Sequence, residues 1–205
     1  MPTVACPPPR PAAVPPPLSA RAERELEFIR RTMERSAGFT AVPGWGGVGM
    51  GTIALAAAAI AHRQPSPSAW LATWLLAAGL SFALGVVAIR RKAARAGVDL
   101  LGHASRSFAI ALFPALAVGA LLTFALHRAG EHALLPGVWL SLFGVGVAGA
   151  GAYSVPAVPL QGACLIALGA LALLRPELGD PWLLALGFGG VQIAFGVYLA
   201  RHHGG

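Results

Sequence analysis

The stretch HRQPSPSAWLATWLLAAGLS, residues 62–81, closes one long apolar segment and opens the next. It places Arg63 eleven positions before Trp74-Leu75, and a glycine and a serine follow in the pattern W-L-x-x-x-G-x-[GS]. The same arrangement recurs at Arg128 with Trp139-Leu140, Gly144 and Gly146. A third copy, at Arg175 with Trp182-Leu183, Gly187 and Gly189, keeps the pattern with a shorter separation of seven positions between Arg and Trp. Because each copy turns the chain back on itself, the three copies predict three related membrane hairpins.

The composition excludes an ordinary soluble domain. Of the 205 residues, 56% are hydrophobic and 11% are charged, whereas soluble domains are about one quarter charged. So much apolar surface requires lipid as its solvent, in which a helix of about 20 apolar residues crosses the bilayer. The two cysteines, Cys6 and Cys164, lie in a proline-rich tail and in an apolar segment, which favours free thiols over a disulfide.

Six apolar segments make up most of the chain, and we expect each to form a transmembrane helix. They lie at 44–61, 69–89, 107–126, 135–153, 158–174 and 182–200. The predicted fold is therefore all-α, a polytopic membrane domain over residues 44–201 with its six helices arranged as three hairpins. Tryptophans mark the predicted outer ends, as in an interfacial aromatic belt; they are Trp70, Trp74, Trp139 and Trp182.

Two further segments precede this domain. Residues 1–19 hold two runs of three prolines and predict a disordered or polyproline tail. Residues 20–37 predict an amphipathic helix, since Leu26, Ile29 and Met33 fall on one face. That stripe suits contact with membrane lipid, with basic residues facing anionic headgroups, and it equally suits a cytoplasmic protein that docks on the helix.

The distribution of basic residues predicts the orientation. With the N-terminus inside, 12 of the 15 Lys and Arg residues fall in inner segments and one falls in each outer loop. Positive charge stays on the cytoplasmic side, so we expect a multi-pass protein of the inner (plasma) membrane with both termini in the cytoplasm. Orientation and anionic lipid account for the basic inner face, which therefore requires no nucleic acid.

The predicted spans hold no charged chemistry, since no Asp, Glu, Lys, Arg or His lies deep within them. Ion-coupled transporters and proton pumps carry such residues near the midplane, so we expect neither, nor any enzymatic activity or cofactor. Gln192 suits an interhelical hydrogen bond or a solute ligand, and Gly146 and Gly189 suit helix packing or a solute path. Gly47 and Gly51 permit close helix contact in a G-x-x-x-G spacing, which leaves an oligomer open.

The outer loops gather a few side chains that bind metals or titrate near neutrality. His127, Glu131 and His132 lie close together in the sequence. Such residues suit zinc or a pH-sensing cluster, but H-x-x-x-E-H lacks the spacing of the metalloprotease signatures. We therefore predict hydrated loop residues and no metal, with these three as the weak metal candidates.

Two resemblances carry a family-level implication. The stretch LEFIRRTMERSAGFTAVPGWGG, residues 26–47, resembles a signature shared by a group of uncharacterised bacterial integral membrane proteins, which implies no particular activity. The last hairpin, from GACLIALGALALLRPE to FGVYLAR, is similar to the repeat of HdeD-like membrane proteins. Those are six-span bacterial proteins built of two-helix repeats and associated with acid resistance. This chain departs from them in its long basic N-terminal segment, and no functional residue transfers from either group.

These observations predict a non-enzymatic inner-membrane protein with a regulatory or stress-related role, whose helix 20–37 contacts lipid or a partner. The alternative is a small permease for a neutral or lipophilic solute, lined by the glycine-rich spans and Gln192.

Overall fold

The computed structural model describes residues 26–27, 44–96, 103–151, 154–178 and 182–202. The chain divides into two units, Met1–Ala37 and Gly38–Gly205. Of the first unit only Leu26 and Glu27 are described, and both are helical with exposed side chains. The predicted tail 1–19 and the other stripe residues, Ile29 and Met33, lie outside the described residues.

Helices are the only regular secondary structure in the described part of the second unit, which confirms the all-α class. Its long helices are α2 (Gly44–Ala61), α3 (Pro67–Ala96), α4 (His103–Ala129), α5 (Leu135–Gly151), α6 (Ala157–Leu174) and α7 (Gln192–His202). Two short 3-10 turns, η1 (His132–Leu134) and η2 (Pro176–Leu178), follow α4 and α6. A π-helical segment, η4 (Ala185–Val191), runs directly into α7.

Five helices are long and apolar enough to cross a membrane, and they coincide with the first five predicted spans. They are Gly44–Ala61, Pro67–Arg91, Phe108–Ala129, His132–Gly151 and Ala157–Leu174. The sixth predicted span, 182–200, falls on η4 and α7, where the backbone changes from π to α geometry at Gln192. The π turns coincide with three glycines, Gly187, Gly189 and Gly190, and such widened turns are rare and local.

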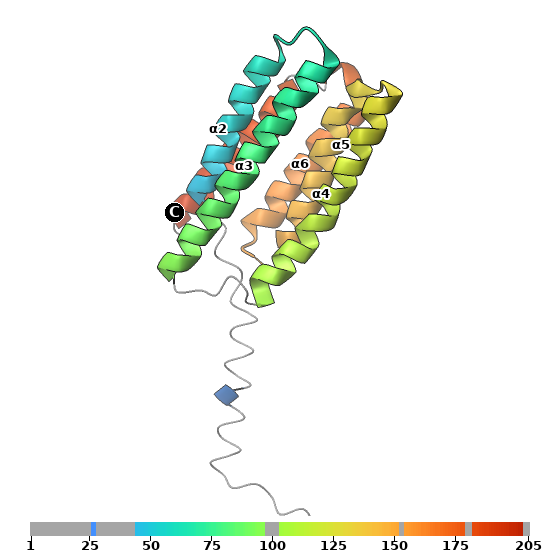
Figure 1. Ribbon diagram of the computed structural model, residues 1–205. Helices are drawn as coiled ribbons and strands as arrows, with labels where there is room; N and C mark the ends of the chain where they lie inside the picture. Colours follow the sequence, from blue (N-terminus) through green and yellow to red (C-terminus); the bar gives the residue numbers. More distant parts are fainter. Residues whose placement is uncertain (1–25, 28–43, 97–102, 152–153, 179–181, 203–205) are drawn as a thin grey trace, which may run out of the picture. The chain divides into compact units, whose positions relative to one another are not determined.

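The helices form two groups of three. In the first group, α2 packs against α3 on one side and against η4 and α7 on the other; in the second, α5 packs between α4 and α6 (Figure 1). The predicted hairpins α2–α3 and α4–α5 are therefore packed pairs. The third pair differs, because α6 packs most extensively on α5 and α7 on α2. The relation among the three hairpins stays a prediction.

Glycine allows very close backbone contact within each group. A Cβ atom built on Gly162 of α6 would lie 2.5 Å from the Ala148 nitrogen and 2.7 Å from the Gly144 oxygen, both on α5. On α2, a Cβ at Gly51 would lie 2.9 Å from the Gly189 oxygen. The G-x-x-x-G pair of α2 therefore packs against η4 and α7 of the same chain, as small residues do in membrane helices.

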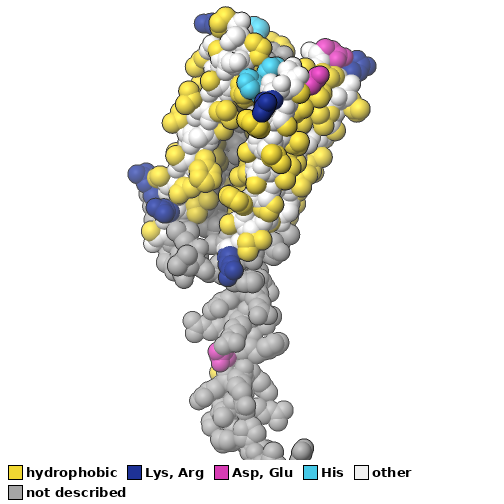
Figure 2. Space-filling model, turned by 45° about the vertical axis from the view of Figure 1, so that its right-hand side comes forward, with side chains coloured by type: hydrophobic (Ala, Val, Ile, Leu, Met, Phe, Trp, Pro, Cys, Tyr) yellow, Lys and Arg dark blue, Asp and Glu magenta, His cyan; other side chains and the backbone are white. Residues whose placement is uncertain are grey.

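The outward faces of the helices are apolar. Large hydrophobic side chains such as Leu76 of α3 and Phe113 of α4 are strongly exposed. Figure 2 shows hydrophobic side chains along the length of the helices, with Lys, Arg, acidic and His side chains gathered toward the two ends. In water such a surface would be a large aggregation-prone patch, whereas the hydrocarbon core of a bilayer matches it.

Candidate functional site at the interface between the helix groups

The contact between the two helix groups is made by a series of side chains along the helices. Aromatic rings come first, at the end where α3 begins: Trp70 of α3 stacks on Trp139 of α5 with centroids 5.5 Å apart and planes 12° apart. Phe143 of α5 and Phe188 of η4 follow, edge to face at 5.5 Å. Further along, Val147 of α5 packs in one cluster with side chains of α6 and α7. This interface is uncharged along the described length of the helices.

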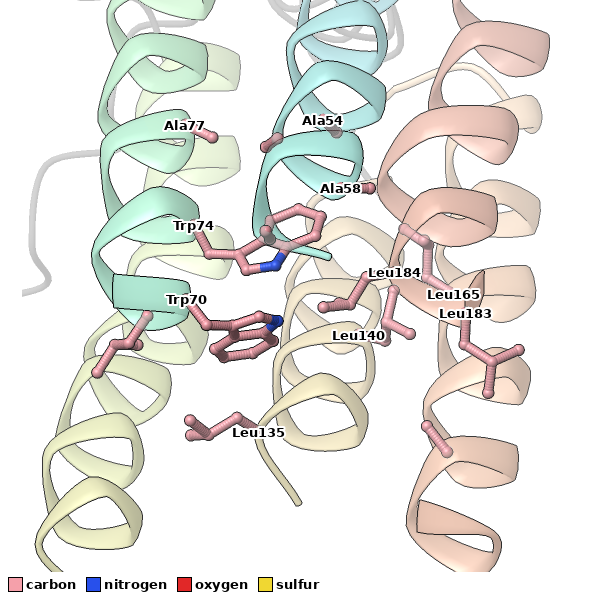
Figure 3. Packing of buried hydrophobic residues seen from close by; sticks show 14 residues of the cluster. Ala54, Ala58, Trp70, Trp74, Ala77, Leu135, Leu140, Leu165, Leu183 and Leu184 are labelled. Atoms are coloured by element: carbon pink, nitrogen blue, oxygen red, sulfur yellow. The ribbon is translucent and has the colours of Figure 1, made fainter. Parts of the chain in front are cut away.

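Trp74 completes the aromatic cluster because it lies four residues after Trp70, on the same face of α3. Its ring lies 6.4 Å from the rings of Trp70, Trp139 and Phe188. The two side chains are 9% (Trp70) and 4% (Trp74) exposed, among leucines that include Leu140 and Leu184 (Figure 3).

The predicted lipid-facing belt is therefore wrong for Trp70 and Trp74. They are core residues, whereas Trp182, at 77% exposure, faces outward as expected. Trp139 is partly buried and packs against the same core. The prediction fails because burial depends on the tertiary structure. The residues that cover α3 come from α5 and η4, more than 60 positions further along the chain.

The indole nitrogens of the cluster differ in their partners. Trp139 Nε1 donates a hydrogen bond to Thr123 Oγ1 on α4 at 2.7 Å, and that hydroxyl donates to the Gly119 carbonyl at 2.7 Å. The Nε1–H groups of Trp70 and Trp74 are buried and meet no acceptor among the described residues. A buried donor without an acceptor costs about 1–3 kcal/mol, so these two groups are the unusual polar feature of the interface.

A pair of amides also joins the two helix groups. Gln161 of α6 donates from Nε2 to Oε1 of Gln192, the first residue of α7, at 2.5 Å, and both side chains are buried. Each amide thereby finds a partner in an apolar interior, where an unpaired amide would be costly. The sequence predicts an interhelical hydrogen bond or a solute ligand at Gln192 but does not identify Gln161 as its partner.

The two glycines predicted for packing or a solute path face neighbouring helices. A Cβ on Gly146 of α5 would lie 2.9 Å from Leu112 and 3.1 Å from Ala115, both on α4. A Cβ on Gly189 would overlap the side chain of Leu55 on α2. Both positions are thus filled by side chains from their own helix group.

His127 and His132, which the sequence predicts on the outer side, form a pair. His127 Nδ1 and His132 Nε2 are 2.9 Å apart, and His132 Nδ1 lies 3.0 Å from the Gly130 carbonyl. Gly130 has φ +79°, a left-handed conformation that glycine adopts easily, and it folds the chain back at the end of α4. Glu131 lies beyond that helix and is exposed. No group of three or more metal-binding side chains occurs in the described part of the chain.

Comparison with known proteins places the chain in no family. No protein-family model, no curated protein and no solved structure matches it. The two resemblances seen in the sequence stay predictions, and the function has to be argued from the interface itself.

Proposed function

We propose that this chain is a non-enzymatic integral protein of the inner membrane with both ends in the cytoplasm. Five apolar helices and an apolar surface between two charged ends support insertion, and the excess of basic residues in the inner segments supports the orientation. In a variant with Cys6 and Cys164 changed to Ser, Gln64→Cys should react with an impermeant maleimide on intact cells. Arg91→Cys should react only after permeabilisation, and the reverse result would invert the topology.

The polar groups of the interface support a non-enzymatic role. The polar groups described above at the interface are two amides, the Thr123 hydroxyl and three indoles, and all of these are neutral groups that act neither as a base nor as an activated nucleophile near neutral pH. No acid, base or nucleophile constellation of the kind that catalysis needs is found there.

Within this class the geometry best supports a small permease for a neutral or lipophilic solute. The observation that carries it is a contrast in packing. Every glycine of the described helices whose added Cβ would lie within 3 Å of another helix's backbone makes that contact inside one group. Across the groups, Gly187 of η4 meets only side chains, those of Leu140, Leu165 and Leu168.

This contrast supports a domain built of two rigid bodies. Backbone-to-backbone packing resists separation, whereas a contact made of rings and leucine side chains can re-form at another angle. Alternating access needs such rigid bodies that rock about a central site. Because the interface is uncharged, the solute that suits it is neutral.

A reversible cross-link between the groups tests this proposal. In the cysteine-free background, Gln161→Cys and Gln192→Cys would be bridged by a short bis-methanethiosulfonate reagent, because the two side chains touch. Vesicles containing the protein would be assayed for uptake of neutral radiolabelled solutes, graded from glycerol to benzyl alcohol. The cross-link should stop uptake, and reductant should restore it.

The matched control is a bridge inside one group. Gly119→Cys with Leu142→Cys joins α4 to α5, where the two positions are in van der Waals contact, and this bridge should leave uptake intact. Uptake no faster than in protein-free vesicles, or unchanged by the inter-group bridge, would refute the permease.

The second candidate is the regulatory or stress-related protein that docks through helix 20–37. Its supporting observation is limited to Leu26, which is helical and exposed. Affinity purification from native membranes, comparing the full chain with one lacking residues 1–37, would decide it. A protein recovered only with the full chain, and lost after Leu26→Glu with Ile29→Glu and Met33→Glu, would favour docking over transport.

A further inference from the structure

The indole N–H groups of Trp70 and Trp74 are buried and meet no acceptor among the described residues. We infer that the Nε1–H groups of Trp70 and Trp74 form a binding site for the oxygen acceptor of a neutral solute, such as a carbonyl oxygen on an apolar body. This inference rests on the proposed solute-binding role and names the class of solute.

The two rings are close enough to line one site. Residues four apart lie about 5–6 Å from each other on a helix face, and the two ring centroids are 6.4 Å apart with planes tilted by 56°. Figure 3 shows both indoles projecting from α3 toward the core, with the Trp70 nitrogen at the end of its ring away from α3 and the Trp74 nitrogen on the edge of its ring that faces Trp70. One oxygen with two lone pairs, or two neighbouring oxygens, would satisfy both donors.

Among the described residues, the surrounding side chains supply no substitute acceptor. The amides of Gln161 and Gln192 bind each other, and the Thr123 hydroxyl already accepts from Trp139. The Trp70 ring is nearly parallel to that of Trp139, at 12°, so its in-plane N–H does not point at the face of that ring. Within this one cluster of rings, the indole N–H of Trp139 has an acceptor, whereas those of Trp70 and Trp74 have none among the described residues.

The surroundings also define what the solute must lack. The buried side chains around the indoles are alanines and leucines without charge, so an ion would lose its hydration without compensation. The site offers donors and no acceptor, so a solute that carries an O–H or N–H would leave its own donor unpaired. Sites of this kind discriminate strongly between analogues that differ in one polar group. A ketone should therefore bind better than the matching alcohol, and the matching hydrocarbon should bind least.

The indole N–H signals of the ¹⁵N-labelled full chain in lipid nanodiscs report directly on this site. The probes are acetophenone, 1-phenylethanol and ethylbenzene, which differ only in the oxygen. Signals are assigned with Trp70→Phe and Trp74→Phe, which keep an aromatic ring, and with Trp182→Phe as the control outside the cluster. We expect acetophenone to move the Trp70 and Trp74 signals downfield and to leave the Trp182 signal in place. Each removed donor should weaken acetophenone binding about three- to tenfold.

Three results would overturn the inference. If the Trp70 and Trp74 indole protons exchange with water and their signals do not respond to acetophenone, water is the acceptor. If these signals lie upfield and do not respond to acetophenone, each N–H points at a ring face, and if they respond equally to acetophenone and ethylbenzene, the oxygen is not recognised. The permease is tested separately by uptake. If solute is taken up but the indole signals do not respond, the binding site is refuted and the permease proposal stands. If the indole signals respond but no solute is taken up, the binding site stands and the permease proposal is refuted.

Discussion

The close contact between α5 and α6 predicts that Gly162→Ala destabilises the protein. In Gly162→Ala, the new methyl group would lie 2.5 Å from the Ala148 nitrogen and 2.7 Å from the Ala148 Cβ and the Gly144 oxygen. Non-bonded heavy atoms prefer about 3.5–4.0 Å. Because two of these three contacts are with backbone atoms, no side-chain rotation relieves them, and the helices must separate by about 1 Å.

The free-energy change follows from that separation. Forced overpacking of a close contact costs about 1–3 kcal/mol, and a gap of 0.5–1 Å forfeits about a quarter to a half of each lost contact along the helix pair. Alanine recovers about 1 kcal/mol over glycine through helix propensity. We expect a net destabilisation of about 2 kcal/mol, which corresponds to a fall in melting temperature of about 4–8 °C for a domain of this size.

The matched control is Gly79→Ala on α3. A Cβ at Gly79 meets nothing within 4 Å, so only the propensity gain of at most about 1 kcal/mol applies. Thermal unfolding of both variants in the same detergent, followed by far-ultraviolet circular dichroism, makes the comparison. The reasoning is refuted if Gly162→Ala melts at or above the parent temperature, or if the two variants shift equally.

Other contacts give further predictions. Gln161→Leu or Gln192→Leu alone should lower the free energy of unfolding by about 1–3 kcal/mol because the partner amide is left unpaired, and the double variant should recover much of that loss; additive losses in a denaturant titration would contradict the pairing. Thr123→Val should destabilise by a similar amount because it removes the acceptor of Trp139, and adding Trp139→Phe should cost little more, since the unpaired N–H is then gone. The outer histidine pair should hold no stoichiometric zinc after dialysis, because two imidazoles alone fall short of the three or four protein ligands usual for zinc; one equivalent of zinc, lost on changing both to Ala, would contradict this.

The sequence was sufficient for the positions of the five helices that are long and apolar enough to cross a membrane, because hydropathy acts locally and each apolar run is bounded by charge or proline. The predicted span limits at 89 and 107 lie within two residues of the apolar spans, which end at Arg91 and begin at Phe108. The helices themselves extend beyond these spans, since α3 continues to Ala96 and α4 begins at His103. Helix formation carries on through the basic residues that end the span, because Arg, Lys and Ala all favour helix. The π turns of η4 had no counterpart in the hydropathy pattern.

The candidate site was less accessible from sequence, because it depends on which helices are neighbours. Trp70 and Trp74 satisfy the pattern of an interfacial belt, and only their contacts with Trp139 and Phe188 make them core residues. A weaker signal was present for the amides. Gln161 and Gln192 are the only amide side chains in the predicted spans, and two lone amides in an apolar interior are natural partners.

The glycine contacts within each group also bear on how this sequence changes over generations. Where one backbone rests on another, only a residue without a side chain fits, so Gly144, Gly151 and Gly162 should resist replacement. The lipid-facing positions of α3 and α4 require only an apolar residue, and there leucine, valine, isoleucine and phenylalanine can interchange freely. Descendants of this chain should therefore diverge quickly in overall identity while keeping the spacing of their glycines. Distant homologues would therefore be identified by the spacing of these glycines rather than by the apolar sequence around them.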